Sequence, residues 1–168
     1  MINEALKIDN TQFRFDEKVH KEDVQKIVDL ISEVGVFSPA EIQVSGELVA
    51  ETLKNPEAYK FIFLRDAQNN VLAYSCYGEI CMAKDRYDLY WIAVSKKWQN
   101  QKLATVILEK TESEIKKLGG KKIYAETSSL PTYAAARGFY LKSGFAKVAE
   151  MSDFYKDGDN KVIFCKEI

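Results

Sequence analysis

The sequence predicts an α/β protein with a mixed, mostly antiparallel sheet, one parallel β-α-β unit and helices on both faces. The length of 168 residues suits one domain of ordinary size. Short apolar or alternating runs, typical of strands, interleave with longer stretches of helical periodicity. The segment 87–128 reads strand, helix, strand, which folds as a right-handed parallel crossover. No repeat or linker interrupts the chain, so we expect a single domain over residues 1–168.

The first third is predicted to hold one strand and two helices. Residues 11–17 alternate apolar and polar side chains, as a short strand does. Apolar residues at helical spacing then indicate a helix that ends at Gly35. The tetrapeptide 38–41, SPAE, has the cap, the first-turn proline and the capping-box glutamate of a second helix start. That helix is expected to end near Pro56 and to be weakened at Gly46.

The middle of the chain is predicted to be three strands followed by a helix. Strands 59–66 and 71–80 flank Gln68-Asn69-Asn70, which is typical of a hairpin turn. A third strand, 87–94, ends in five apolar residues, as a strand covered on both faces would. A helix over 101–118 follows.

The last third alternates strand and helix before a final hairpin. We expect a strand at 121–128, a short helix at 131–144, and strands at 145–156 and 160–167 around the turn-forming residues 157–160. The complete order is β-α-α-β-β-β-α-β-α-β-β.

The amino-acid composition argues against several classes of function. Lys plus Arg is 24 and Asp plus Glu is 25, a balance that argues against nucleic acid as the main partner. Three cysteines, no CxxC and a single histidine, His20, leave no ordinary metal-ligand set, so we expect free thiols and no metal. No secretory h-region and no apolar run long enough to span a bilayer occur, which favours a cytoplasmic location away from membranes.

The strand end at 94, its loop and the next helix form a candidate anion site. Free backbone N–H groups and the helix dipole meet at such a junction and suit phosphate. Lys96, Lys97 and Lys102 add positive charge around it. The alternative is that these lysines are only a solvated rim.

Residues 91–110, WIAVSKKWQNQKLATVILEK, resemble the coenzyme A motif of the GCN5-related N-acetyltransferases (GNAT), a strand followed by (Arg/Gln)-x-x-Gly-x-(Gly/Ala) and a helix. Gln99 and Ala104 match this motif, whereas Lys102 stands where the family usually has glycine. Glycine lets the backbone approach the pyrophosphate closely. A lysine must either point away or lay its ammonium on a phosphate.

A second segment, ARGFYLKSGF at 136–145, resembles the later motif of the same family. Its matching residues are Ala136, Phe139, Tyr140, Gly144 and Phe145. The resemblance covers about residues 11–168 and implies a GNAT-like fold with acetyl-CoA as co-substrate. It implies that the pantetheine arm lies between strands 87–94 and 121–128 and that a backbone N–H stabilises the oxyanion. The coenzyme-binding residues that it implies are Ile92, Ala93, Val94, Gln99, Asn100, Gln101, Lys102, Leu103, Ala104, Thr105 and Tyr140.

The catalytic roles are also implied by the resemblance. Tyr140 matches the position whose phenol serves the coenzyme sulfur as an acid, and a buried aromatic is the alternative. In histone-acetylating members a glutamate occupies a place similar to that of Asp88, which makes Asp88 the first candidate for the base. Glu79 and Glu126 are alternatives, as is a chain of waters. The aromatic residues that could line an acceptor pocket for a cationic amine, if they are not ordinary packing, are Phe37, Tyr87, Tyr90, Trp91 and Tyr155.

Two functions are therefore weighed. The first is an acetyl-CoA-dependent N-acetyltransferase acting on a primary amine of a small molecule or peptide. The second is a non-catalytic acyl-CoA-binding or sensor module of the same fold. Lys102 favours the second, and Tyr140, which mere binding does not require, favours the first. The sequence specifies neither the acceptor nor the oligomeric state, for which a homodimer is one option.

Overall fold

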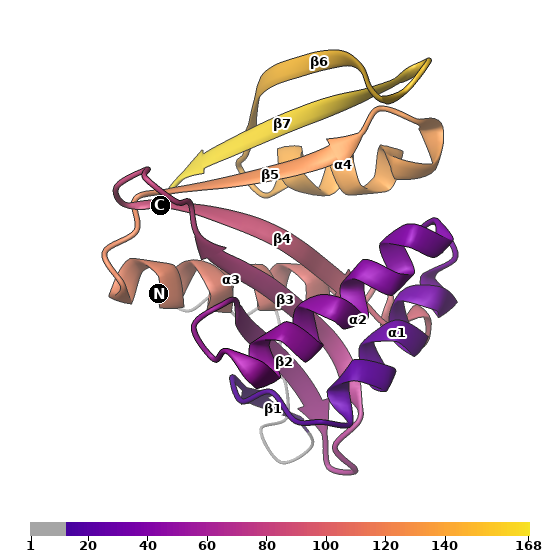
Figure 1. Cartoon of the computed structure of the whole chain (residues 1–168), viewed down its shortest axis with the longest axis vertical. Coiled ribbons are helices and arrows are strands. Elements are labelled where there is room, and N and C mark those ends of the chain that lie inside the picture. Colours follow the sequence, from indigo (N-terminus) through magenta and orange to yellow (C-terminus); the bar gives the residue numbers. More distant parts are fainter. Residues whose placement is uncertain (1–12) are drawn as a thin grey trace. The chain divides into compact units, whose positions relative to one another are not determined.

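The computed structural model describes residues 13–168. Seven strands form one mixed sheet in the order β1-β2-β3-β4-β5-β7-β6 (Figure 1). β4 and β5 are parallel, whereas β1 with β2, β5 with β7, and β6 with β7 are antiparallel. The strands are β1 (Phe13–Asp16), β2 (Lys60–Asp66), β3 (Val71–Glu79), β4 (Arg86–Val94), β5 (Lys122–Ser128), β6 (Ala146–Lys156) and β7 (Asp159–Glu167).

The described residues also form four α-helices, in the order that the sequence predicts, and two 3-10 helices. They are α1 (Asp23–Val34), α2 (Pro39–Lys54), η1 (Lys96–Trp98), α3 (Leu103–Lys117), η2 (Pro131–Tyr133) and α4 (Ala134–Lys142). None of the described helices has an apolar stretch long enough to cross a membrane. The predicted α/β class with a mixed sheet is confirmed. Residues 11 and 12 of the first predicted strand lie outside the described residues.

Contacts within the chain group it into two compact units. Unit 1 holds the described residues up to Cys76 together with Trp91–Thr111, and unit 2 holds Tyr77–Tyr90 together with Glu112–Ile168.

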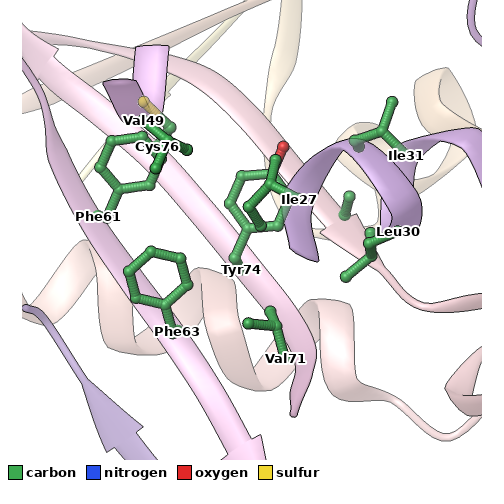
Figure 2. Close-up of a cluster of buried hydrophobic side chains, with 10 residues drawn as sticks. Ile27, Leu30, Ile31, Val49, Phe61, Phe63, Val71, Tyr74 and Cys76 are labelled. Atoms are coloured by element: carbon green, nitrogen blue, oxygen red, sulfur yellow. The ribbon is translucent and has the colours of Figure 1, made fainter. Parts of the chain in front are cut away.

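In unit 1, helices lie on both faces of the strands. α1 and α2 cover one face and bury an apolar cluster against it (Figure 2). On the other face, Ser75 of β3 shares a 2.7 Å hydrogen bond with Thr111 of α3. Because neighbouring residues of a strand point to opposite faces, Ser75 points away from the cluster. The cluster consists of Ile27, Leu30, Ile31, Val49, Phe61, Phe63, Val71, Tyr74, Cys76 and Ala93.

The two early helices begin and end where the sequence indicates. Gly35 ends α1 in the left-handed conformation, with φ of 79°. Ser38 and Glu41 form the predicted capping box at the start of α2. α2 continues through Gly46 without a break. A Cβ at Gly46 would lie 2.7 Å from Cγ2 of Val28, so glycine there lets α1 and α2 approach closely.

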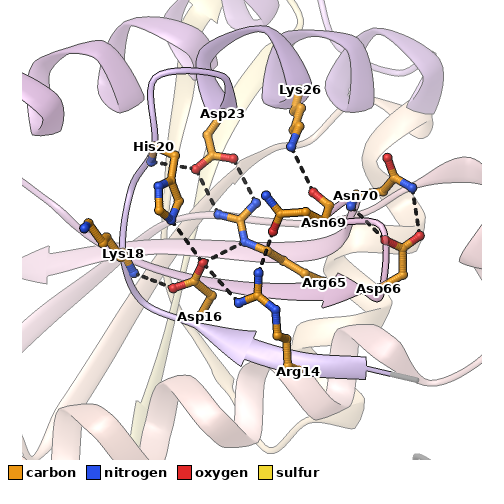
Figure 3. Close-up of polar contacts among 10 residues, drawn as sticks. All are labelled: Arg14, Asp16, Lys18, His20, Asp23, Lys26, Arg65, Asp66, Asn69 and Asn70. Carbon is orange, nitrogen blue, oxygen red and sulfur yellow. Dashed lines mark hydrogen bonds and ion pairs between the residues drawn. The ribbon is translucent and has the colours of Figure 1, made fainter. Parts of the chain in front are cut away.

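A buried ion-pair network joins β1, β2 and the start of α1 (Figure 3). The fully buried Arg65 donates two hydrogen bonds to Asp23, of 2.8 and 2.9 Å, and one of 2.9 Å to Asp16. Burial alone would raise the pKa of Asp16, but the N–H group of Lys18 and the Arg65 charge outweigh it, so the pKa is lowered. The single histidine, His20, lies 3.5 Å from Asp16 in this network.

In unit 2, α4 and the end of α3 pack on one face of the strands. Tyr140 of α4 contacts the Phe164 ring of β7, with 5.4 Å between ring centres. Lys166, two residues further along β7, is paired at 2.5 Å with Glu112 of α3. Residues two apart on a strand share a face, so both helices lie on the same side. The predicted helix 131–144 is divided into η2 and α4.

Candidate functional site

The junction between β4 and α3 lies wholly within unit 1 and is anchored on both sides. The Ser95 N–H donates a 2.8 Å hydrogen bond to the Leu72 carbonyl, which keeps the end of β4 beside β3. The Trp98 ring of η1 packs edge-on against Phe13, with centroids 5.4 Å apart. A fixed strand end therefore leads into the loop 99–102.

Two residues of this loop have left-handed backbone conformations. Asn100 and Lys102 each have φ of 60°. Asparagine tolerates this region, but a lysine there costs about 1–2 kcal/mol relative to ordinary backbone. The helix consequently begins at Leu103 instead of at residue 101. The backbone thus keeps, at Lys102, the conformation that glycine would adopt most easily.

This geometry fits a phosphate. The Lys102 carbonyl accepts the Val106 N–H at 3.2 Å, so Lys102 is the residue from which α3 starts. The first N–H groups of a helix, here those of Leu103, Ala104 and Thr105, have no partner inside the helix. Left-handed residues beside such groups turn N–H bonds toward a common point and create an anion-binding concavity. The Lys102 side chain is exposed.

The sequence-predicted coenzyme residues other than Tyr140 are brought together along this junction. Gln99 reaches back with its amide nitrogen 3.5 Å from the Val94 carbonyl. Of the last five residues of β4, only Ala93 is buried, whereas Ile92 and Val94 are half-buried and Tyr90 is 42% exposed. The expectation that this strand end is covered on both faces is therefore wrong. Its apolar residues leave part of the strand surface available.

Tyr140 lies in unit 2, on α4. It is 7% exposed and packs between Phe145 and Phe164, with both ring centres 5.4 Å away. Burial raises the pKa of Tyr140 to about 12, so the phenol stays protonated at any pH at which proteins normally work. It can donate a proton or a hydrogen bond but cannot serve as a base.

Within unit 2 the parallel pairing of β4 and β5 is short. It joins Arg86–Leu89 to Lys122–Ala125, although β5 continues to Ser128 and pairs with β7 along that length. Asp88 lies in the last paired stretch, opposite Tyr124. Tyr90 and Glu126 are the first residues beyond it. The strands thus stop pairing just past the carboxylate of Asp88.

Asp88 shares one face of unit 2 with two other charged side chains. Burial and the nearby negative charge of Glu126 raise the pKa of Asp88, and the positive charge of Lys161 opposes them. Lys161 itself forms an ion pair of 2.6 Å with Glu126. Sequence reasoning missed Lys161, because only the register of β5 against β7 brings it beside Glu126.

Glu79, another predicted carboxylate, lies on the opposite face. The Ile80 N–H donates to the Arg86 carbonyl at 2.8 Å, which fixes the register of this hairpin. Glu79 then falls opposite Tyr87, whose pKa it raises after the larger effect of burial. Since Tyr87 and Asp88 are adjacent on β4, their side chains point to opposite faces.

The candidate acceptor aromatics are divided between the two units. In unit 1, Phe37 and Trp91 pack together, with 5.1 Å between ring centres. In unit 2, Tyr87 is buried, and the exposed Phe154 and Tyr155 lie near the Lys161 ammonium, whose distance to the Phe154 ring is 3.9 Å.

Comparisons with known proteins agree with this geometry. A family model described as an acetyltransferase (GNAT) domain matches residues 28–162. A solved structure from Desulfovibrio desulfuricans, assigned to the GNAT family of acetyltransferases, is 34% identical with a TM-score of 0.89. That match covers 92% of this chain and 98% of the other. A comparison with curated proteins gave no match.

More distant structures share the fold. The ribosomal-protein-S18-alanine N-acetyltransferase from Escherichia coli is 19% identical over 93% of this chain and 94% of its own, with a TM-score of 0.73. An aminoglycoside 6′-N-acetyltransferase complexed with coenzyme A is 16% identical over 92% and 96%, with a TM-score of 0.71. At these identities the similarity concerns the architecture.

Proposed function

The chain belongs to the GNAT family of acetyltransferases, and we propose that it transfers the acetyl group of acetyl-CoA to a primary amine of a small molecule or peptide. The observation that carries this proposal is the loop before α3. Asn100 and Lys102 there hold left-handed backbone at the position of the family's glycine motif, although neither is glycine. A sequence without use for that backbone would relax into ordinary helix, which is the less costly conformation for lysine.

The coenzyme would be held along the β4–α3 junction. The N–H groups of Leu103, Ala104 and Thr105 and the ammonium of Lys102 are the donors for its pyrophosphate. The backbone of Ile92 and Val94 is the proposed partner of the pantetheine arm. A backbone N–H at the end of β4 would then stabilise the oxyanion that forms on the thioester carbonyl.

The transfer needs one base and one acid. Asp88 takes one proton from the ammonium, and the neutral amine nitrogen then attacks the thioester carbon; a C–N bond forms and the C–S bond breaks. The second proton of the nitrogen passes by way of water to Tyr140, once that phenol has protonated the thiolate. The raised pKa of Asp88, caused first by burial and then by Glu126, brings this carboxylate closer to working pH and makes it a better base. The Tyr140 phenol supplies the proton that the leaving thiolate takes.

The acceptor is proposed to be cationic before it reacts. Glu126 and the Phe154 ring already hold the Lys161 ammonium, so the half-buried Asp88 carboxylate is the group on this face that would attract a substrate ammonium. Free cysteines throughout the described chain favour a reducing compartment, so we keep a cytoplasmic location.

A non-catalytic acyl-CoA-binding module is the second candidate. The observation that favours it is Lys102, whose side chain replaces a hydrogen atom at the point of closest approach to the coenzyme. Such a module would bind the coenzyme without a need for Asp88 or Tyr140.

The proposal is tested by pairing a binding assay with a kinetic one. Coenzyme A at saturation should raise the melting temperature by mass action. Asp88→Asn should retain that shift but lose acetyl transfer to a cationic amine, with partial recovery at higher pH, where more of the amine is already neutral. If coenzyme A leaves the melting temperature unchanged, the proposed coenzyme site is wrong. If Asp88→Asn transfers the acetyl group as fast as wild type, Asp88 is not the base.

A further inference from the structure

Three charged side chains cross the face of unit 2 that points away from α4. Asp88 on β4 is opposite Tyr124, and Glu126 follows two residues later on β5. Lys161 on β7 is opposite Ser128, again two residues from Glu126. Residues two apart on a strand share a face, so Glu126 lies diagonally between Asp88 and Lys161.

The Lys161 ammonium is held in place. It lies 2.6 Å from Oε2 of Glu126 and 3.9 Å from the centre of the Phe154 ring, and its side chain is only 15% exposed. A carboxylate on one side and an aromatic face on the other fix a lysine far better than solvent does. This lysine is therefore part of the carboxylate cluster and not a mobile surface charge.

The pairing distinguishes the two carboxylates. Glu126 is paired with Lys161 and therefore already has a partner. Within the described part of the chain, the Asp88 carboxylate has no hydrogen bond or ion pair, and Glu126 and Lys161 act on it only through their charges. The carboxylate that can accept a proton from a substrate is thus Asp88.

We propose that Lys161 is a positioning residue: it ties Glu126 into an ion pair and so leaves Asp88 as the carboxylate that takes the proton from the acceptor amine. This inference rests on the proposed acetyl transfer. It adds to that function a residue on β7, outside both motifs of the coenzyme and acid sites, that decides which of two neighbouring acids acts as the base.

The charges around Asp88 determine in which direction its pKa shifts when one of them is removed. The titratable or charged groups on its face are Lys122, Tyr124 and Glu126 from β5, Lys161, Cys165 and Glu167 from β7, and Arg86 and Tyr90 from β4 itself; β3 places Gly78 opposite it. Removing Lys161 takes away a charge that lowers the pKa of Asp88, and removing Glu126 takes away one that raises it. The two substitutions break the same ion pair yet should shift Asp88 in opposite directions.

The test compares Lys161→Met, Lys161→Arg and Glu126→Gln in the full chain. Side-chain ¹³C NMR titration reads the pKa of Asp88 directly and needs no activity. We expect the pKa of Asp88 to rise in Lys161→Met, to fall in Glu126→Gln and to change little in Lys161→Arg, which keeps the positive charge. Because Asp88 acts when deprotonated, the acid limb of kcat/KM should move to higher pH in Lys161→Met, with about tenfold lower activity on that limb.

Opposite shifts would support the positioning role, since mere loss of packing would affect both variants alike. Shifts in the same direction, or no shift in Lys161→Met, would overturn it. Asp88→Asn at wild-type kcat/KM would overturn the base role on which the inference rests, and would do so separately from the titration. The titration thus tests the positioning role of Lys161, and the kinetics of Asp88→Asn test the base role of Asp88.

Discussion

Two substitutions at Lys102 separate the effect of its ammonium charge from the effect of its left-handed backbone conformation. Lys102→Ala removes the ammonium and keeps a side chain in left-handed backbone at φ of 60°. Lys102→Gly removes the ammonium and also relieves the strain, which is about 1–2 kcal/mol for a non-glycine residue. Greater freedom of glycine in the unfolded chain offsets about 0.5–1 kcal/mol of that gain.

The two variants are expected to differ in melting temperature but to lose similar affinity for coenzyme A. Loss of one charge-assisted phosphate contact should weaken coenzyme A binding by about 1–2 kcal/mol, or roughly 5- to 30-fold, in both variants. The ligand-free protein should melt about 2 °C higher in Lys102→Gly than in Lys102→Ala, because a net gain of roughly 0.5–1 kcal/mol remains for the glycine variant.

Isothermal titration calorimetry measures the first effect and thermal unfolding the second. Lys54→Ala on α2 is the matched control, since it removes an exposed positive charge that lies outside the junction. Clearly tighter binding in Lys102→Gly than in wild type would contradict a phosphate-binding role of the ammonium: lysine would then obstruct the coenzyme, and the non-catalytic module would gain support.

Three further outcomes follow from the same geometry. Tyr140→Phe should keep the fold and coenzyme affinity but lower kcat by about 10²- to 10⁴-fold; a change within about twofold would make Tyr140 a packing residue. Tyr74→Phe should raise the free energy of unfolding by about 1 kcal/mol, because among the described residues the buried Tyr74 hydroxyl has no hydrogen-bond partner; destabilisation would indicate that water satisfies it. Arg65→Met should cost about 3–5 kcal/mol at neutral pH. The lowered pKa of Asp16 gives the wild type stability that is present above about pH 4 and is lost as pH falls through the folded pKa. The difference in free energy of unfolding between wild type and Arg65→Met should therefore become smaller in acid. A difference that stays constant with pH in denaturant titrations would contradict this.

Much of the fold can be read from the sequence because its signals are local. The capping box of Ser38 and Glu41, the stop at Gly35 and the turn glycine Gly158 each act within a few residues. Local signals also place Gln99 in the loop before a helix and Ala104 in its first turn. They do not reveal a backbone conformation that a residue adopts against its preference. Lysine has no preference for the left-handed region, so its residue type does not indicate the positive φ of Lys102.

The remaining differences depend on register, which the sequence does not specify. Glu79 and Asp88 both lie on neighbouring strands, yet the Ile80–Arg86 hydrogen bond sends them to opposite faces. Lys161 and Glu126 are far apart in sequence and meet only through the pairing of β5 with β7. The five apolar residues that end β4 suggested a fully covered strand, but apolar character alone cannot distinguish burial in a core from the wall of a binding surface.

Transfer of an acetyl group from acetyl-CoA to an amine can be measured directly on the wild-type protein. The protein is incubated with acetyl-CoA and a panel of primary amines, and both the released thiol and the N-acetylated product are quantified by mass spectrometry. We expect equal amounts of the two with at least one cationic amine, and no thiol release above background without an amine. Stabilisation by coenzyme A with no amide formed from any amine in the panel would contradict this expectation and leave the acyl-CoA-binding module as the function.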